Sequence, residues 1–259
     1  MVVLGELNPN IRSKLIELFE RNQKVDLSID SIIAEGQTGR NISIIVDNLL
    51  NPKVVQLSQG TFTMFAGDTK NEVAFELVRN LSHLYWIMPC SEEWLNLIKD
   101  VHGDKLVQSE RYSFSGESIE KSHLIDLIEN NPFKEMLCKI DMEMANKMAE
   151  DELNKYHFMN YNSPEHFINT GFGYCVKIDN KIVSACSSGL ICKVGAEICI
   201  ITHPDYREKD LATLTAAKFI LNCLDNGLVP HWDAANPKSI GLAKKLGYTY
   251  VGSYNVYHI

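Results

Sequence analysis

The sequence predicts an α/β (α+β) protein of two domains. Its 259 residues suffice for two modest domains that each bury a core. Short runs rich in β-branched and aromatic residues alternate with segments whose apolar residues recur at helical spacing. Hydrophobic residues make up 45% of the chain and charged residues 22%, as in ordinary folded domains. We expect an N-terminal α/β domain at residues 1–112 and a second domain at residues 113–259.

The first domain is expected to begin with two short helices, around residues 11–20 and 27–34. Gly36 suits the end of the second helix, because glycine accepts a left-handed backbone conformation. The domain contains neither a G-x-x-x-x-G-K loop nor a G-x-G-x-x-G run, so its sequence indicates no chemistry. Its other expected elements are strands within 42–48, 54–67, 84–89 and 105–115 and helices within 72–80 and 92–101.

The second domain is expected to open with a pair of helices between residues 116 and 156. Apolar residues there, with Met136 and Ile140 among them, recur at helical spacing, and proline breaks the pattern at Asn131-Pro132. Asp179-Asn180 separates two strand-like runs and indicates a hairpin, since both residues tolerate positive φ. The remaining expected elements are strands within 196–203, 228–233 and 248–257 and helices within 211–225 and 238–246.

Composition and charge exclude several classes of protein. The net charge of −8 argues against a nucleic-acid partner, since phosphate binding needs a surplus of Lys and Arg, and it suits a cationic substrate better. No stretch approaches the ~20 apolar residues of a membrane helix, and the first residues lack a basic leader. We therefore expect a soluble, cytoplasmic protein without a membrane partner.

The cysteines are expected to be buried, reduced thiols. They lie within or beside apolar segments, are odd in number and include no C-x-x-C pair. A zinc site requires paired cysteines or a close His/Cys set, so no metal is expected. The cysteines are Cys90, Cys138, Cys175, Cys186, Cys192, Cys199 and Cys223.

The segment from Ala196 to Leu224 is the most informative part of the chain. A strand that runs through Thr202 is followed by a short proline-containing loop and directly by a helix. The unpaired N–H groups of such a turn, with the positive end of the helix dipole, suit a phosphate or pyrophosphate. The loop sequence Arg207-Glu208-Lys209-Asp210-Leu211-Ala212 resembles the Arg/Gln-x-x-Gly-x-Gly/Ala motif of the GCN5-related N-acetyltransferases, or GNAT superfamily.

The resemblance implies a GNAT fold in the second domain, with a mixed, largely antiparallel sheet flanked by helices. HWDAAN, THPDYR and FINTGFGYCV, with IIVDNLLNPKVVQL and FTMFAGD upstream, are similar to a bacterial branch that carries an extra N-terminal α/β domain. The resemblance also implies acetyl-CoA as the acyl-donor cosubstrate. The residues assigned to its binding are Ile201, Thr202, Arg207, Glu208, Lys209, Asp210, Leu211, Ala212, Thr213 and Asn236.

Two positions depart from the family pattern. Asp210 stands where the first motif glycine is expected, and it adds a side chain and a negative charge next to an anion. Weaker CoA binding is the expected consequence, although Asp210 also suits the N-cap of the helix beginning at Leu211, and Lys209 and Arg207 can offset its charge. Ala243 stands where the last helix of the family often carries a Tyr that acts as general acid.

The closing segment VPHWDAANPKSIGLAKKLGYTYVGSY resembles the last strand, helix and strand of the family. In the family the Asn at the position of Asn236 lies near the pantetheine arm. Asn236 followed by Pro237 also suits a helix N-cap with proline at the first helical position, and the two roles are compatible. The residues that match the pattern are Asn236, Ser239, Lys245, Gly247 and Tyr248.

The reaction implied by the family needs a base, because only a neutral amine attacks a thioester. Glu197 precedes Arg207 by nearly the family distance. Cys199 and Ile201 share its strand face and are expected to be buried, an environment that raises a carboxyl pKa. A solvated Glu at a strand edge is an equal alternative.

Two histidines and one aspartate complete the set of candidates for catalysis. His203 and His231 end the two strands that spread apart in the family fold, and imidazole titrates in the required range. A structural hydrogen-bonding role is the alternative for each. Asp233 could orient His231 or bind the substrate ammonium, whereas Trp232 is expected to be a packing residue.

The leading hypothesis is an acyl-CoA-dependent N-acyltransferase that moves acetyl from acetyl-CoA to an amine of a small molecule or peptide. Asp210 and Ala243 motivate the alternative, a catalytically weak or inactive GNAT-fold protein that binds or senses CoA. The acceptor, the role of the first domain and the oligomeric state are left open, and a homodimer is compatible with the sequence.

Overall fold

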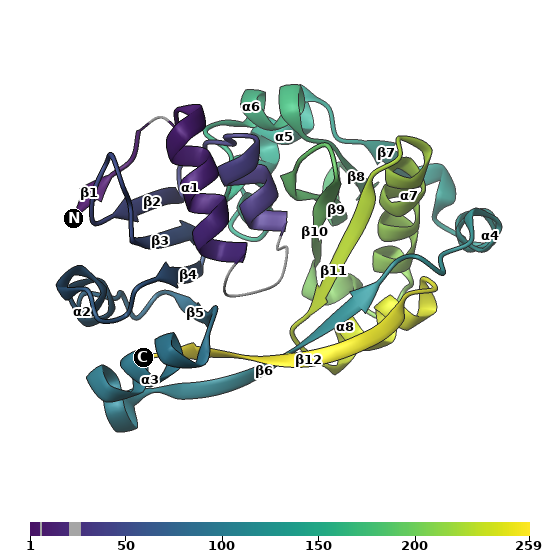
Figure 1. The fold of residues 1–259 in the computed structure, drawn as a ribbon. Helices are drawn as coiled ribbons and strands as arrows, with labels where there is room; N and C mark the ends of the chain where they lie inside the picture. Colours follow the sequence, from purple (N-terminus) through teal and green to yellow (C-terminus); the bar gives the residue numbers. More distant parts are fainter. Residues whose placement is uncertain (6, 21–26) are drawn as a thin grey trace. The chain divides into compact units, whose positions relative to one another are not determined.

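The computed structural model describes residues 1–5, 7–20 and 27–259 (Figure 1). Contacts divide this chain into two compact units. One unit comprises Met1–Glu110 together with Tyr254–Ile259, and the other comprises Arg111–Ser253. The chain passes from one unit to the other within strands β6 (Val107–Ser115) and β12 (Thr249–His258). The C-terminal residues therefore belong to the first unit.

The first unit contains a mixed sheet in the order β1-β2-β3-β4-β5-β12. Strands β1 to β4 pair antiparallel with their neighbours, whereas β4 and β5 are parallel. Its core includes Trp94 of α3, whose ring stacks on Phe65 of β4 with centroids 5.1 Å apart. The elements are β1 (Val2–Val3), α1 (Pro9–Glu20), the π-helical η1 (Ile29–Ala34), β2 (Ile42–Val46), β3 (Val54–Gln59), β4 (Phe62–Gly67), α2 (Glu72–Arg79), β5 (Trp86–Pro89), α3 (Glu92–His102) and the 3₁₀ turn η2 (Gly103–Lys105).

Local sequence signals set the ends of several of these elements. Gly36 adopts a φ of +76°, which confirms its expected place after the second helix. The side chain of Asn71 accepts a hydrogen bond from the N–H of Val73 and caps α2. Gly67 has a φ of +100°, and a Cβ at this position would lie 1.9 Å from the carbonyl oxygen of Lys53. The β3–β4 hairpin therefore requires glycine there.

The second unit contains a mixed, largely antiparallel sheet in the order β12-β6-β11-β10-β9-β8-β7. Only the β10–β11 pairing is parallel among the strand pairs described from β6 to β7. The other elements are α4 (Lys121–Glu129), η3 (Lys134–Met136), β7 (Leu137–Lys139), α5 (Met142–Glu150), η4 (Asn154–Phe158), α6 (Pro164–Thr170), β8 (Gly173–Ile178), β9 (Lys181–Ile191), β10 (Gly195–Thr202), η5 (Pro204–Tyr206), α7 (Leu211–Asp225), β11 (Val229–Ala234) and α8 (Pro237–Lys245).

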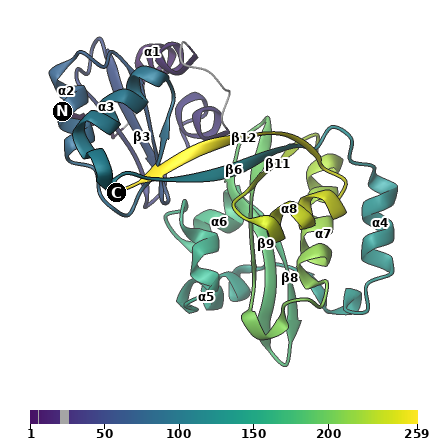
Figure 2. The same cartoon turned by 90° about the horizontal axis from the view of Figure 1, so that it is seen from below.

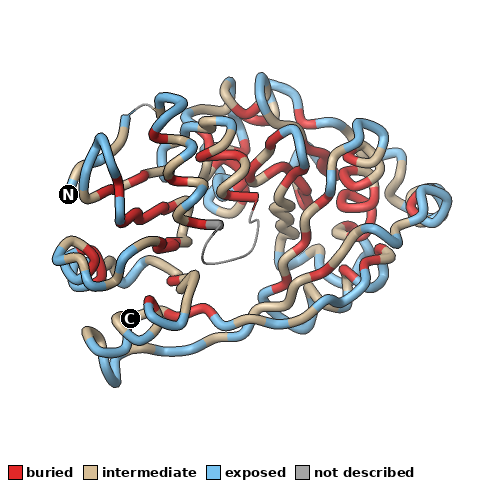
Figure 3. The backbone as a smooth tube through the Cα atoms, viewed as in Figure 1, coloured by how far each residue is buried: buried red, intermediate tan, exposed pale blue. Residues whose placement is uncertain are grey.

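Helices cover both faces of this sheet. Neighbouring side chains of β8 point to opposite faces and pack against different helices. Tyr174 packs with Phe219 of α7 and other residues of one core, whereas its neighbour Cys175 packs with Phe167 of α6 in a second core. Figure 2 shows α4, α7 and α8 on one side of β8 and β9 and α5 and α6 on the other. Figure 3 shows buried residues along the strands and through most of α7.

The hairpin expected at Asp179-Asn180 is confirmed, since both residues have positive φ, 47° and 62°, between β8 and β9. The expected helical pair is correct for α4 and α5 but wrong between them. Met136 ends a 3₁₀ turn and Ile140 follows β7, an edge strand that pairs with β8. The apolar spacing of this segment predicts a helix. Pairing with β8, which is distant in the sequence, makes Leu137–Lys139 a strand instead. Across the described residues, every helix is too short or too polar to span a membrane.

Candidate active site

Strands β10 and β11 run side by side for a short distance and then diverge. Their parallel pairing joins Gly195, Ala196 and Glu197 to Val229, Pro230 and His231. Beyond this point β10 continues to Thr202 along β9, whereas Trp232 to Ala234 of β11 pair with β6. A β-bulge between Glu197 and Ile198 accompanies the change of direction. The two strands thus open a gap at the Glu197/His231 pair.

Glu197 and His231 lie in contact at this opening. They are register partners on adjacent strands, so their side chains leave the same face of the sheet. The Nδ1 atom of His231 and Oε2 of Glu197 form a close ion pair or hydrogen bond. The side chains are 40% and 28% exposed, so the pair is accessible to a ligand. Cys199 and Ile201, expected to be buried on the same face, are only half-buried.

Asp233 follows His231 on the same face of β11 but has a different partner. Its Oδ1 accepts a hydrogen bond from Nε of Arg111 at 2.9 Å, and both side chains are largely buried, at 13% and 17% exposure. The carboxylate held against Nδ1 of His231 is therefore that of Glu197. Trp232, which lies between His231 and Asp233 in β11, is a packing residue as expected and is 2% exposed. Its Nε1 donates a hydrogen bond to Oγ of Ser239.

His203 lies at the entrance to the loop that joins β10 to α7. Nε2 of His203 lies 2.8 Å from Nζ of Lys181, and its Nδ1 lies 3.3 Å from the backbone nitrogen of Asp205. Because an ammonium can only donate, Nε2 is the acceptor in the first contact. These contacts shape the loop, which is the structural role considered for this histidine. Its side chain remains 23% exposed.

The loop has the backbone conformation that the motif glycine requires. Glu208 and Asp210 adopt φ values of 62° and 56°, in the left-handed region that glycine enters freely. Arg207 and Lys209 are exposed, and Nζ of Lys209 lies 5.0 Å from the ring centre of Tyr206. The chain thus turns as the motif predicts although it lacks the glycine.

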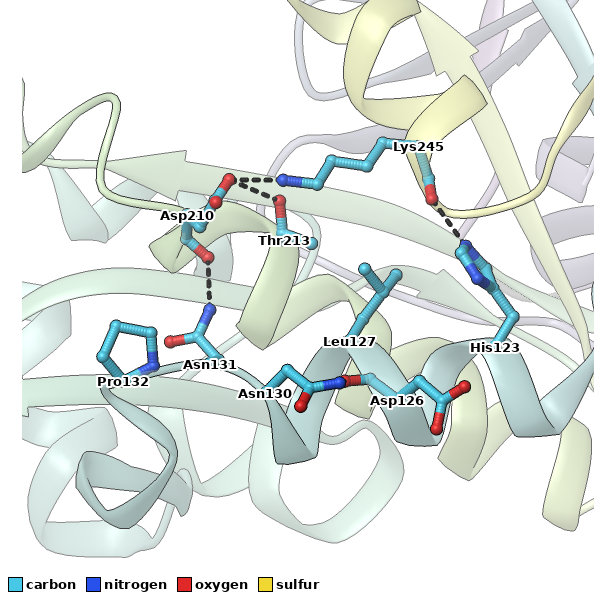
Figure 4. Close-up of a pocket in the computed structure, with 9 residues that line it drawn as sticks. All are labelled: His123, Asp126, Leu127, Asn130, Asn131, Pro132, Asp210, Thr213 and Lys245. Carbon is cyan, nitrogen blue, oxygen red and sulfur yellow. Dashed lines mark hydrogen bonds and ion pairs between the residues drawn. The ribbon is translucent and has the colours of Figure 1, made fainter.

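The expectation that Asp210 caps α7 is wrong. It occupies the N-cap position, but its left-handed backbone directs the carboxylate elsewhere and no side-chain cap forms. Oδ1 of Asp210 accepts from Nζ of Lys245 at 2.6 Å and from the hydroxyl of Thr213 at 3.4 Å (Figure 4). Lys245, rather than Lys209 or Arg207, therefore balances its charge. The Asp210 carbonyl accepts from Nδ2 of Asn131.

A cavity of about 320 Å³ lies beside this ion pair. In Figure 4, α4 and the turn after it form one wall, and the start of α7 and the end of α8 form the other. The cavity itself was not expected from the sequence, but its lining includes Asp210 and Thr213, which were assigned to acetyl-CoA binding, and Lys245, which matches the family pattern. The residues that line it are His123, Asp126, Leu127, Asn130, Asn131, Pro132, Asp210, Thr213 and Lys245.

The last helix shows what the Asn236 and Ala243 positions do locally. Asn236 accepts the N–H of Ser239 at 3.0 Å and Pro237 stands at the first helical position, which confirms the expected N-cap. Ala243 is fully buried in the core, so this helix position faces away from solvent. The nearby hydroxyl of Tyr248 donates to the carbonyl of Pro230, and burial raises the pKa of Tyr248 well above its usual range.

The structure thus brings the sequence candidates together in two groups. Glu197 and His231 meet at the strand opening, with Asp233 on the same face. The other group is the loop and the start of α7, from His203 to Thr213, which continues β10. Asn236 lies at the end of β11, where α8 begins.

Comparison with known proteins agrees with this geometry. The family model for GNAT acetyltransferases matches residues 18–257. The chain is 29% identical over 269 aligned residues to the uncharacterized N-acetyltransferase YdfB of Bacillus subtilis, with 100% of this chain and 99% of the relative covered. A crystal structure of a GCN5-related N-acetyltransferase-like protein from Streptococcus suis has a TM-score of 0.81 and 28% identity, and covers 95% of this chain and 97% of its own.

A more distant structure supports the fold alone. The putative GNAT acetyltransferase of Novosphingobium aromaticivorans superposes with a TM-score of 0.52 at 14% identity, over 80% of this chain and 87% of its own. The family model, the full-length relative and the Streptococcus suis structure define an acyltransferase with a mixed sheet flanked by helices. The chain belongs to the GNAT acetyltransferase family, and it is an N-acetyltransferase of the GNAT type.

Proposed function

We propose that the protein transfers the acetyl group of acetyl-CoA to an amine of a small molecule or a peptide. The observation that carries this proposal is the Glu197–His231 pair at the point where β10 and β11 diverge. An amine is protonated near neutral pH and must lose a proton before it attacks a carbonyl. The Glu197–His231 pair, at the opening between the strands, could accept this proton.

The pair has the chemistry of a general base. An imidazole can accept a proton near neutral pH. The Glu197 carboxylate beside Nδ1 of His231 would stabilise the imidazolium that forms. Partial exposure of both side chains allows the acceptor amine to approach. Because the two residues are register partners, the sheet itself holds them in position. We therefore assign proton transfer to the pair rather than to His203, whose ring nitrogens contact Lys181 of β9 and the backbone nitrogen of Asp205.

The loop between β10 and α7 fits the pyrophosphate of acetyl-CoA. Its left-handed residues Glu208 and Asp210 reproduce a glycine conformation, and the positive end of the α7 dipole follows directly. We propose that residues Ile201, Thr202, Arg207 to Thr213 and Asn236 bind this cosubstrate, with Lys245 available from α8. Acetyl-CoA supplies the activated thioester when bound. Among the described residues, no group of three His, Cys, Asp or Glu is arranged to hold a metal.

The remaining parts of the proposal concern the acceptor and the location. The net charge of −8 favours a cationic acceptor over a nucleic acid. Seven free cysteines suit the reducing conditions of the cytoplasm. We also propose that residues 1–112 form an N-terminal α/β domain, which in the structure is completed by Tyr254–Ile259. A homodimer is compatible with all of these features.

A second candidate function is binding or sensing of CoA without efficient catalysis. The burial of Ala243 favours it, because the last helix offers no hydroxyl at the position of the family's general acid. Tyr248 does not replace that group, since its hydroxyl is buried and donates to Pro230. In this case the loop would bind CoA and the Glu197–His231 pair would have a structural role.

The test begins with titration calorimetry of the full chain with acetyl-CoA, followed by an acetylation assay across a panel of amines. We expect binding, and we expect Glu197→Gln and His231→Asn to lower kcat/KM about 100-fold while the affinity for acetyl-CoA is unchanged. Glu143→Gln is the matched control, because this exposed glutamate forms an ion pair on α5.

The pH profile separates a base from a structural pair. If the pair acts as the general base, kcat/KM of the native protein should rise with pH. The Glu197→Gln and His231→Asn variants should not show this rise. Binding without transfer to any amine would support the sensor function. Absence of binding at millimolar acetyl-CoA would contradict both functions.

A further inference from the structure

Cys138 and Cys175 face each other across the edge of the second unit's sheet. They are register partners in the antiparallel β7–β8 pair. Their Sγ atoms lie 3.6 Å apart, and Sδ of Met144 lies 3.9 and 3.8 Å from them. Directly opposed residues in such a pair have Cα atoms about 4.5 to 5.5 Å apart, within the range that a disulfide spans. The two thiols can therefore join without rearranging the strands.

The two thiols differ in reactivity. A hydrogen bond from Cys175 lowers the pKa of Cys138 to about 7, with help from Lys177 and against burial and Asp141. The same hydrogen bond and burial raise the pKa of Cys175. Cys138 is half-buried on a strand at the sheet edge, whereas Cys175 is fully buried behind it. This is the arrangement of an attacking thiolate with a resolving thiol next to it.

Three other cysteines of this unit, Cys186, Cys199 and Cys223, have the opposite character. Burial raises the pKa of Cys199 and of Cys223 to about 12, and that of Cys186 well above its usual range. These thiols stay protonated near neutral pH, and a protonated thiol is a poor nucleophile. Oxidation should therefore be selective for the β7–β8 pair.

We propose that Cys138 and Cys175 form a modification site at which hydrogen peroxide produces an intramolecular disulfide. The Cys138 thiolate attacks one peroxide oxygen, the O–O bond breaks, and Cys138 becomes a sulfenic acid while hydroxide leaves and takes a proton as water. The Cys175 sulfur then attacks the sulfenyl sulfur, the S–O bond breaks, and a second water leaves with the Cys175 proton. Peroxide is reduced by the two electrons that the thiols lose.

The disulfide would attach the edge strand to the body of the sheet. β7 follows the turn at Asn131, which holds the carbonyl of Asp210 at the start of α7. α5, η4 and α6 all lie in the chain between the two cysteines. Linking Cys138 to Cys175 closes this segment into a loop and lowers the entropy of the unfolded chain. Oxidation should therefore raise the Tm of the protein.

Peptide mapping of the full chain tests the proposal. The native protein is treated with hydrogen peroxide, alkylated, and digested with trypsin without reduction. Cleavage after Lys134, Lys139, Lys155 and Lys177 places Cys138 in residues 135–139 and Cys175 in residues 156–177. We expect these two peptides as one linked species, lighter by two hydrogen atoms than their sum, and lost on reduction. When the alkylation is carried out after unfolding in urea, the other five cysteines, Cys90, Cys186, Cys192, Cys199 and Cys223, should be alkylated instead.

Two variants assign the roles and provide the decisive control. Cys175→Ala should stop at the sulfenic acid of Cys138, which a dimedone-type probe labels. It should also raise the pH midpoint of Cys138 alkylation relative to the native protein, because the hydrogen bond from Cys175 is lost. Cys138→Ala should leave Cys175 unmodified. Circular dichroism establishes that each variant is folded. Folded native protein without the linked peptides, or with Cys138 no more reactive than Cys90, would overturn the proposal.

Discussion

Asp210 has two unfavourable properties at the start of α7. It occupies a left-handed conformation that disfavours residues with a side chain by about 1 kcal/mol, although Asp is among the residues that tolerate it best. If the proposed function is correct, its carboxylate also adds a negative charge next to the pyrophosphate of acetyl-CoA. The ion pair with Lys245 at 2.6 Å reduces this repulsion but occupies the lysine. Removal of the carboxylate would leave Lys245 available to an anion.

We expect Asp210→Gly to lower the Kd for acetyl-CoA about fivefold, which corresponds to about 1 kcal/mol. Titration calorimetry measures the change. Asp210→Asn is the matched control, because it removes the charge and keeps a side chain that tolerates the left-handed region. Both variants should bind more tightly if charge repulsion is the cause, and only the glycine should also raise the Tm. Unchanged affinity in both would place the carboxylate away from the cosubstrate.

At the scale of single elements, α8 joins the loop region to the core through its two ends. Its first turn is capped by Asn236, and its last turn supplies Lys245 to Asp210. The indole of Trp232 donates to Ser239 in the first turn, so this helix is attached to β11 as well. A change at Asn236 can therefore affect stability and, if the proposed function is correct, cosubstrate binding.

Two substitutions separate these effects. Asn236→Ala should lower the free energy of unfolding by about 1 kcal/mol, because the cap is lost, whereas Asn236→Ser should retain it. Urea unfolding followed by the fluorescence of Trp232, in a background of Trp86→Phe and Trp94→Phe, measures the difference. Both variants should weaken acetyl-CoA binding. Native affinity in the folded serine variant would restrict Asn236 to the capping role.

At the scale of the whole molecule, stability depends on cores that lie in separate units. One buried histidine makes the second unit sensitive to pH. His157 is 1% exposed, its Nδ1 lies 2.7 Å from Oγ of Ser187, and burial lowers the pKa of His157 to about 3. The unfolded chain has the ordinary histidine pKa of 6.5, so below this pH the unfolded state binds a proton that the folded state excludes.

We therefore expect the free energy of unfolding to fall as the pH drops below 6.5 toward 3. Between pH 7.5 and 5.5 the contribution of this group is a loss of about 1.4 kcal/mol. Urea titrations at the two pH values measure it, and His157→Asn, which keeps a polar group near Ser187, should reduce the difference by that amount. An equal pH dependence in the folded variant would show that other groups cause the acid sensitivity.

Much of the fold followed from local signals in the sequence. The helix at Leu211 to Asp225, the hairpin at Asp179-Asn180 and the cap at Asn236 depend on residues close together in the chain. The GNAT family was recognised from the loop and the closing segment for the same reason. Edge strand β7 was missed, because a short segment becomes a strand only when a distant partner such as β8 pairs with it.

The site depended more on tertiary structure. The sequence by itself determined the candidates Glu197, His231 and Asp233 and the turn that presents the N-terminus of α7. Tertiary structure decided that Glu197 meets His231, that Asp233 pairs with Arg111 and that Lys245 balances Asp210. These partners are separated by 34, 122 and 35 residues. Strand register and helix packing bring them together, and no local pattern encodes such contacts.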